Sequence, residues 1–348
     1  MLTDPRPTLQ PEEKLLLALC RLEFSEEKKK TIKDLIKEVS DWEAFVKLTN
    51  RHGIIALTAY NIKELGLAGR IPGIVMQTLD NGRMKVMLRN TWLVRRWKEI
   101  NAILTDAGIK HLLLKGMALE HTVYGAKGLR QMTDNDILVR KEDALQAWNL
   151  LQEHGFIPET LKSPLYRKII PDIGKHLPTL VKDGYAVEVH NRLFSETDKN
   201  LILDEAIDNA AGIEIEGIKT YTLNNNLHLK YLIAHNLEHV SASGTELKLF
   251  LDISLLKQDN YCSIREDILS DPEKFKIPDY RKKLYSQQFY SLPKNSRMRF
   301  LAGDIFPSIS WMKERHGCGW PWVLVYYPWR MGKLFWLINA GRSKEIKM

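Results

Sequence analysis

Hydrophobic residues recur every three or four positions through most of residues 11–105, which is the spacing of amphipathic helices. Pro11 and Asp41 stand where helices are expected to begin, because both residue types are favoured at helix N-termini. The run 78–108 predicts one more helix, which ends in a glycine. We therefore expect an N-terminal helical region over residues 1–105.

Short apolar runs replace the long helical ones after this region. Residues 109–116 (IKHLLLKG) form an apolar run that ends in glycine, and residues 133–140 (TDNDILVR) alternate with period two, so both predict strands. Residues 175–193 predict a β-hairpin, because Asp183–Gly184 is a strong signal for a two-residue turn.

The spacing becomes mainly helical again after residue 195. The clearest helical segments are 226–243 and 245–259, and short strands are expected within 214–223. We therefore expect an α/β (α+β) fold in which residues 106–195 form a small mixed sheet. The N-terminal helical region and a mainly helical C-terminal region, 196–348, would flank this sheet.

The composition is that of a globular protein, since 44% of the 348 residues are hydrophobic and 27% are charged. An excess of 51 Lys and Arg over 43 Asp and Glu gives a net charge of +8, which favours a polyanionic partner. Three widely separated cysteines without a CxxC pattern argue against a disulfide framework. We find neither a signal peptide nor an uninterrupted apolar run of about 20 residues, so we expect a cytoplasmic protein.

Acidic residues on two of the predicted strands fall on one face of the sheet. Successive side chains of a strand point to opposite faces, so Asp134 shares a face with Asp136, and Glu188 shares one with His190. If the apolar faces of both strands pack on the same helices, Asp134, Asp136 and Glu188 converge. Three close carboxylates repel one another unless a cation neutralises them, which favours Mg²⁺, or a pair of divalent ions, bound to phosphate oxygens.

Candidate phosphate-binding residues precede these carboxylates. Lys115 and Gly116 end the first predicted strand, where glycine lets the backbone approach a phosphate and the next helix would direct its first amides at the anion. Arg130 precedes the two aspartates, and a guanidinium can bind phosphate oxygens in a bidentate manner. The structural alternative for Arg130 is an ion pair with Asp134 or Asp136.

In chain order these motifs read LLLKGMAL, GLRQMTDNDILV and VEVHNRL. Together they resemble the nucleotidyltransferase superfamily with the polymerase-β-like palm and, more narrowly, the uncharacterised nucleotidyltransferase family of bacteria. The resemblance extends from about Trp42 to Leu256. The chain departs from the superfamily at Lys115–Gly116–Met117, where Gly-Ser or Gly-Gly is usual, so a hydroxyl contact to phosphate is missing.

The resemblance implies transfer of an NMP group from an NTP to an acceptor hydroxyl, with release of pyrophosphate. It implies dependence on a divalent metal, Mg²⁺ or Mn²⁺. The residues that would bind this metal and act in catalysis are Asp134, Asp136 and Glu188. The residues that would hold the nucleotide are Lys115, Gly116, Arg130 and His190. The acceptor is open: a small molecule, an RNA and a protein side chain all suit this chemistry.

The candidate site residues also have structural interpretations. Asp134 and Asp136 could form a turn and cap ahead of a surface strand, and Glu188 could be an exposed strand residue. His190 could cap the end of its strand by hydrogen bonding, and His176, which opens the hairpin, has the same two interpretations.

Two alternative functions belong to other classes. The first is a non-catalytic nucleotide- or RNA-binding module on the same fold. The second rests on HNLEH (235–239), which matches the H-x-x-E-H pattern of zinc peptidases, with Glu314 as one candidate for a third ligand. Structurally, its two histidines would pack against the α/β unit. Lys248 and Asp252, one helical turn apart, favour a plain ion pair.

The C-terminal segment combines aromatic and basic residues, which permits contact with bases or a peripheral contact with an anionic surface. The alternative is a packing lid over the helical core. The tryptophans of this C-terminal segment are Trp311, Trp320, Trp322, Trp329 and Trp336.

Overall fold

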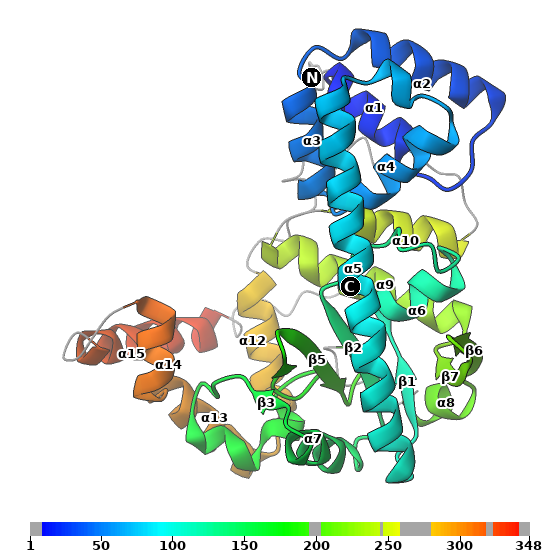
Figure 1. The fold of residues 1–348 in the computed structure, drawn as a ribbon. Helices are drawn as coiled ribbons and strands as arrows, with labels where there is room; N and C mark the ends of the chain where they lie inside the picture. The colour runs from blue at the N-terminus through cyan, green and yellow to red at the C-terminus, as the bar shows by residue number, and fades with distance from the viewer. Residues whose placement is uncertain (1–8, 195–202, 244–245, 258–279, 318–322, 341–348) are drawn as a thin grey trace. The chain divides into compact units, whose positions relative to one another are not determined.

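The computed structural model describes residues 9–194, 203–243, 246–257, 280–317 and 323–340 (Figure 1). The predicted mixed α/β fold is confirmed, because a mixed sheet and many helices make up these residues. By their contacts, the described residues of Met1–Lys98, Leu113–Asn135 and Ala210–Lys276 form one compact unit, hereafter the first unit. Those of Glu99–Leu112, Asp136–Asn209 and Ile277–Met348 form the second unit.

The N-terminal part of the first unit is helical, as its periodicity predicts. Pro11 occupies the first turn of its helix, and the Asp41 carboxylate accepts a hydrogen bond of 2.8 Å from the amide of Ala44, so both expected helix starts are confirmed. Apolar residues of these helices share one buried core. The helices are α1 (Pro11–Leu19), α2 (Glu26–Glu38), α3 (Trp42–Arg51), α4 (Ile55–Glu64) and α5 (Gly73–Asp106).

A sheet of seven strands is formed within the described residues, in the order β3-β4-β5-β2-β1-β7-β6. It is mixed, because β1 pairs with β7 in parallel, whereas the β3–β4, β4–β5 and β6–β7 pairs are antiparallel. The strands are β1 (His111–Leu113), β2 (Asp134–Val139), β3 (Ile157–Pro158), β4 (Leu180–Lys182), β5 (Tyr185–His190), β6 (Ala211–Ile215) and β7 (Ile218–Thr222).

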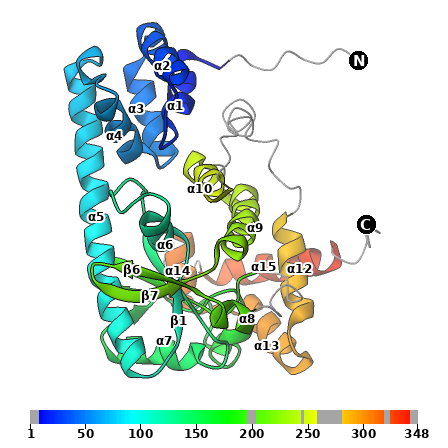
Figure 2. The same cartoon turned by 90° about the vertical axis from the view of Figure 1, so that its right-hand side faces the viewer.

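Two hairpins have the same turn geometry. In the predicted β4–β5 hairpin, Asp183 and Gly184 have φ of 51° and 78°, as a two-residue type I′ turn requires. Glu216 and Gly217, with φ of 47° and 80°, turn β6 into β7 in the same way (Figure 2). The β6–β7 hairpin confirms the short strands expected within 214–223 and begins slightly earlier.

The central strand β2 is buried on both faces. From Asn135 to Val139 every residue is buried, whereas a strand with one solvated face would alternate. Its neighbours β5 and β1 in the sheet cover its two edges. The two acidic positions of β2 therefore differ, since Asp134 at the strand start is half-buried and Asp136 is buried.

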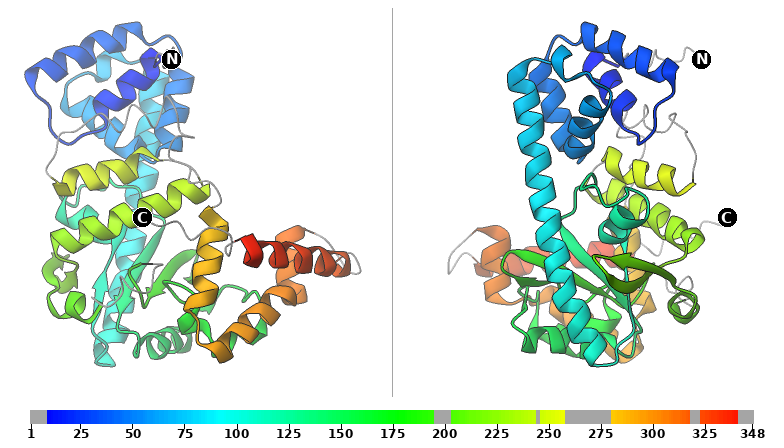
Figure 3. Two further views of the ribbon diagram at one scale, coloured as in Figure 1. Left: turned by 180° about the vertical axis from the view of Figure 1, so that it is seen from behind. Right: turned by 45° about the vertical axis from the view of Figure 1, so that its right-hand side comes forward.

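Further helices complete both units. In the second unit, α12 to α15 pack against one another (Figure 3). No helix in the described part of the chain combines the length and hydropathy that a membrane crossing requires. These helices are α6 (Lys115–Thr122), α7 (Ala144–Glu153), α8 (Leu203–Asp208), α9 (Asn225–Ser243), α10 (Leu247–Lys257), α12 (Tyr280–Ser291), α13 (Lys294–Ile305), α14 (Ile309–His316) and α15 (Val323–Ala340).

Candidate functional site

Strands β2 and β5 bring two carboxylates and an imidazole together in the second unit. Along β5, Val187 and Val189 are buried on one face, and Glu188 and His190 lie on the other, as the period-two pattern predicts. Nε2 of His190 lies 2.8 Å from Oδ1 of Asp136 and 3.3 Å from Oε2 of Glu188. One ligand atom from each of these three residues lies within 4.8 Å of the other two.

The burial of this group sets its electrostatics. Asp136 and His190 are almost inaccessible, whereas the Glu188 side chain is 20% exposed. Burial by itself would raise the pKa of Glu188, but the hydrogen bond with His190 and the neighbouring His176 outweigh this effect and lower the pKa below its ordinary value. Glu188 is therefore a carboxylate at neutral pH, and the group carries negative charge in a buried place.

His176 lies directly opposite His190. The two residues form an antiparallel bridge, so their side chains share a face, and their ring centroids are 5.2 Å apart. Nδ1 of His176 lies 2.8 Å from the carbonyl oxygen of Leu177, and its Nε2 lies 3.8 Å from Oε2 of Glu188. The histidine that opens the predicted hairpin thus borders the acidic group.

The chemistry of this donor set fits a divalent cation. Ligand atoms at about 2.1 Å from an ion lie about 3 Å apart when adjacent and about 4.2 Å apart when opposite, which is close to the separations of Asp136, Glu188 and His190. Nε2 of His190 is the nitrogen that faces the carboxylates, and its buried Nδ1 has no hydrogen-bond partner among the described residues. We conclude that these three side chains could hold a metal ion.

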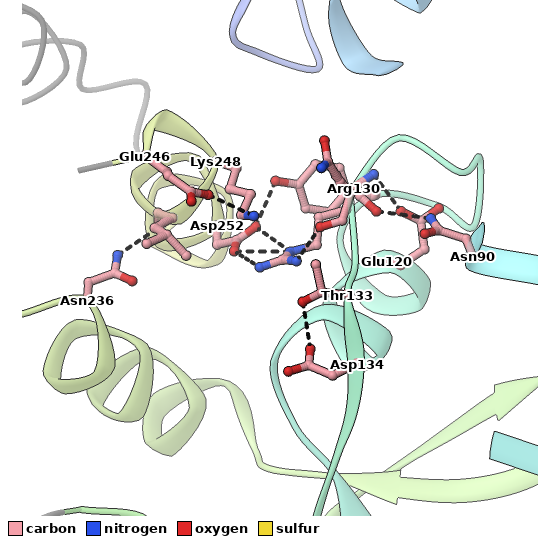
Figure 4. Close-up of polar contacts among 12 residues, drawn as sticks. Asn90, Glu120, Arg130, Thr133, Asp134, Asn236, Glu246, Lys248 and Asp252 are labelled. Carbon is pink, nitrogen blue, oxygen red and sulfur yellow. Dashed lines mark hydrogen bonds and ion pairs between the residues drawn. The ribbon is translucent and has the colours of Figure 1, made fainter. Parts of the chain in front are cut away.

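Asp134 is not part of this close group. It begins β2, is counted in the first unit, and accepts a hydrogen bond of 3.1 Å from the hydroxyl of Thr133 (Figure 4). The structure therefore brings together two of the three predicted carboxylates, those of Asp136 and Glu188. The third member of the group is His190, for which the sequence predicts a contact with the nucleotide instead. The metal-ligand role of Asp134 remains a prediction.

Lys115 and Gly116 begin α6, one residue after β1, whereas the sequence predicts that they end the strand. The apolar run is therefore a shorter strand than predicted, and the helix begins earlier. Lys115 has φ of 47°, a left-handed conformation that is strained for a residue with a Cβ atom. A Cβ atom at Gly116 would lie 3.0 Å from Nη1 of Arg130 and 3.0 Å from Cγ of Met132. The glycine is thus required for packing against the Arg130 guanidinium, whatever ligand the turn binds.

Arg130 is paired with Asp252 of α10, both being buried in the first unit (Figure 4). Nη2 of Arg130 donates to Oδ2 of Asp252 at 2.7 Å, Nε lies 3.2 Å from both carboxylate oxygens, and Nη1 donates to the Gln131 carbonyl at 2.9 Å. The hydroxyl of Tyr124 donates to the same carboxylate at 2.8 Å. Burial alone would lower the pKa of Arg130, but the Asp252 charge raises it, so the guanidinium stays charged.

The main chain around Arg130 is held as well. The Glu120 carboxylate accepts hydrogen bonds from the amides of Gly128 and Arg130, at 2.5 and 2.8 Å, and Nδ2 of Asn90 donates to the Arg130 carbonyl at 3.0 Å. Burial raises the pKa of Glu120, and these amide hydrogen bonds oppose the rise. The segment between α6 and β2 is thereby fixed on both sides of Arg130.

Asp252 is the residue that sequence analysis missed. The expected ion pair joins Lys248 to Asp252, but Lys248 lies 2.7 Å from Glu246 and the partner of Asp252 is Arg130. An acidic residue on the apolar helix α10 is the signal that points to a buried partner, although it does not say which one.

The HNLEH run lies on α9. His235 and His239 are neighbours, with ring centroids 4.5 Å apart, but they belong to no group of three metal-ligating side chains among the described residues.

Within the C-terminal segment, the ring of Trp311 lies 5.9 Å from Nζ of Lys162 and 5.1 Å from Cζ of Arg330, and Trp329 is exposed. Trp320, Trp322 and the Trp336 side chain lie outside the described residues.

Comparison with known proteins gives a family match. No curated protein matches the chain. The model of one protein family, described as uncharacterised nucleotidyltransferase, matches residues 38–273, which is more than half of the chain and includes β2, β5 and α10. This chain therefore belongs to the uncharacterised nucleotidyltransferase family.

Proposed function

We propose that the protein transfers an NMP group from an NTP to an acceptor hydroxyl and releases pyrophosphate, with a divalent cation bound at Asp136, Glu188 and His190. The observation that carries this proposal is the buried group of two carboxylates and an imidazole, in a chain that belongs to a nucleotidyltransferase family. The negative charge of its carboxylates favours a positive partner, and a bound divalent cation provides one.

The residues of β2 and β5 have distinct tasks in this proposal. Asp136 and Glu188 hold the cation, and its charge neutralises the phosphate oxygens and the leaving pyrophosphate. Glu188 is a carboxylate at neutral pH, so it can also accept the proton of the acceptor hydroxyl. Asp134, two residues before Asp136, keeps its predicted role as an additional carboxylate toward the metal-bound triphosphate.

The β1–α6 turn supplies the phosphate contacts in this proposal. The first amides of α6 and the ammonium of Lys115 bind phosphate oxygens, and the strained φ of 47° at Lys115 is the cost of shaping this turn. Arg130 supports the turn, because its guanidinium packs against Gly116. The same guanidinium is paired with the Asp252 carboxylate. We therefore give Arg130 a positioning role and leave the direct phosphate contact to Lys115.

Transfer of label from NTPs tests the proposal. The four NTPs, labelled at the α-phosphate, are incubated with the protein, a divalent cation and candidate acceptors, including the protein itself, and pyrophosphate release is followed. We expect Asp136→Asn to abolish metal-dependent release. Asp106→Asn, at an exposed position of the same unit, is the matched control and should retain it.

Two results would contradict the proposal. Equal release by the wild type and Asp136→Asn would remove Asp136 from catalysis. Steeply salt-dependent nucleic-acid binding by a protein that releases no pyrophosphate with any NTP would favour the non-catalytic binding module.

A further inference from the structure

The geometry points to a property of the metal site that goes beyond its three-residue core. We propose that His176 is a further ligand of the divalent cation held by Asp136, Glu188 and His190, so that the site binds Mn²⁺ more tightly than Mg²⁺. This inference rests on the proposed function only in assigning a catalytic use to the metal.

The hydrogen bonding of His176 determines which nitrogen can act as a ligand. Nδ1 lies 2.8 Å from the Leu177 carbonyl, and a carbonyl oxygen only accepts, so Nδ1 carries the proton. In the neutral ring Nε2 then has a lone pair. Metal-bound histidines typically donate their second ring N–H to a carbonyl or carboxylate, which fixes the ring, and His176 has this arrangement.

The position of His176 also suits a ligand. Its Nε2 lies 3.8 Å from Oε2 of Glu188, within the range of about 3 to 4.2 Å that separates two ligands of one ion. The antiparallel bridge to His190 holds the two rings on the same face, next to the carboxylates. His176 lies outside the group whose ligand atoms are all within 4.8 Å of one another, so its side chain must move for Nε2 to reach the metal.

The resulting donor set determines the metal preference. Two imidazole nitrogens and two carboxylates form a mixed nitrogen and oxygen set. Mg²⁺ strongly prefers oxygen ligands and gives up its waters reluctantly, whereas first-row transition metals accept imidazole readily. Mn²⁺, which accepts both carboxylate and imidazole ligands, is the metal of choice for a test because its binding is visible by electron paramagnetic resonance.

Titration of the full chain with Mn²⁺ alone, without nucleotide, tests the inference. His176→Asn retains a donor for the Leu177 carbonyl and removes the ligand nitrogen. We expect it to raise the Kd for Mn²⁺ by at least about tenfold and to weaken the nitrogen modulation of the bound Mn²⁺ spectrum. The matched control is His154→Asn, because His154 is exposed and its Nδ1 likewise lies 2.8 Å from a carbonyl, that of Leu150.

A second variant covers the case in which His176→Asn fails to fold. His176→Gln places an amide oxygen near the Nε2 position, and we expect it to lower the preference for Mn²⁺ over Mg²⁺ by about tenfold. An unchanged Kd for Mn²⁺ in His176→Asn, an unchanged metal preference in His176→Gln, or displacement of Mn²⁺ by equal Mg²⁺ in the wild type would overturn the inference.

These outcomes are separable from those of the proposed function. If the wild type releases pyrophosphate and His176→Asn binds Mn²⁺ normally, the enzyme stands and the His176 assignment fails. If Mn²⁺ binding depends on His176 and no NTP is used, the metal site stands and the proposed reaction fails.

Discussion

Arg130 and Asp252 form a buried bidentate ion pair between residues that are 122 positions apart in the sequence. The pair ties the segment that leads into β2 to helix α10, within the first unit (Figure 4). The guanidinium also packs against Gly116, where a Cβ atom would lie 3.0 Å from Nη1 of Arg130. A single contact therefore links a predicted phosphate-binding turn to a helix that the motifs do not include.

Removal of one partner of this pair should be far more harmful than removal of both. Asp252→Ala leaves a buried guanidinium without its counter-charge, and we expect it to lower the free energy of unfolding by about 3–5 kcal/mol. The double variant Arg130→Met, Asp252→Leu replaces the pair with apolar groups and should recover most of this loss. Urea denaturation measures both, and a cost below about 1 kcal/mol for Asp252→Ala would show that the pair is dispensable.

Gly116→Ala tests the packing of the turn on Arg130. The new Cβ atom would lie 3.0 Å from both Nη1 of Arg130 and Cγ of Met132, so these side chains must move. We expect a loss of about 1–2 kcal/mol in the free energy of unfolding and a higher KM for NTP. Gly73→Ala, where nothing lies within 4 Å of the new atom, is the control and should change neither quantity adversely.

Replacement of Lys115 by glycine should stabilise the fold and weaken the binding of NTP. Lys115→Gly relieves the strain of a left-handed residue at φ 47°, and we expect it to stabilise the fold by about 1 kcal/mol and to raise the KM for NTP about tenfold. Ala126→Gly relieves the same strain at φ 55° in the loop after α6, and it should stabilise the protein without any change in KM. Equal KM values in the two variants would remove Lys115 from phosphate binding.

Local signals account for the parts of the fold that the sequence predicts. The Asp183–Gly184 turn, the helix starts at Pro11 and Asp41, and the alternation around Glu188 each depend on a few neighbouring residues. Their geometry follows from backbone preferences and side-chain periodicity, which any short window of sequence contains.

Long-range partners could not be predicted in this way. The parallel β1–β7 pair joins Leu113 to Thr222, and the Arg130–Asp252 contact joins two elements whose own sequences say nothing of each other. For the site, the alternation places Glu188 and His190 on one face, but the register that brings Asp136 to them depends on the order of strands in the sheet. Only the folded chain contains that information.

Two buried histidines of the first unit should make the protein sensitive to mild acid. Burial lowers the pKa of His52 and of His228 from 6.5 to about 4, with the charges of Arg51 and Arg130 acting in the same direction. Between pH 6.5 and 4 the unfolded chain therefore binds more protons than the folded chain. Stability is complete above pH 6.5 and falls as the pH drops toward 4, by at most about 3 kcal/mol for each histidine.

Denaturation curves at several pH values measure this effect. We expect His228→Gln to flatten the fall in the free energy of unfolding between pH 6.5 and 4. The matched control is His154→Gln at the exposed position that follows α7, which should leave the slope of the wild type. A slope that His228→Gln leaves unchanged would mean that His228 does not titrate in this range.

The position of a bound metal tests most directly whether Asp136 and Glu188 hold the cation. Crystals grown with Mn²⁺ and a non-hydrolysable NTP analogue give anomalous scattering at the manganese edge. We predict a peak at about 2.2 Å from carboxylate oxygens of Asp136 and Glu188, with an imidazole nitrogen among its ligands. A bound nucleotide whose metal lies away from Asp136 and Glu188, or the absence of any peak beside them, would contradict the assignment of this site.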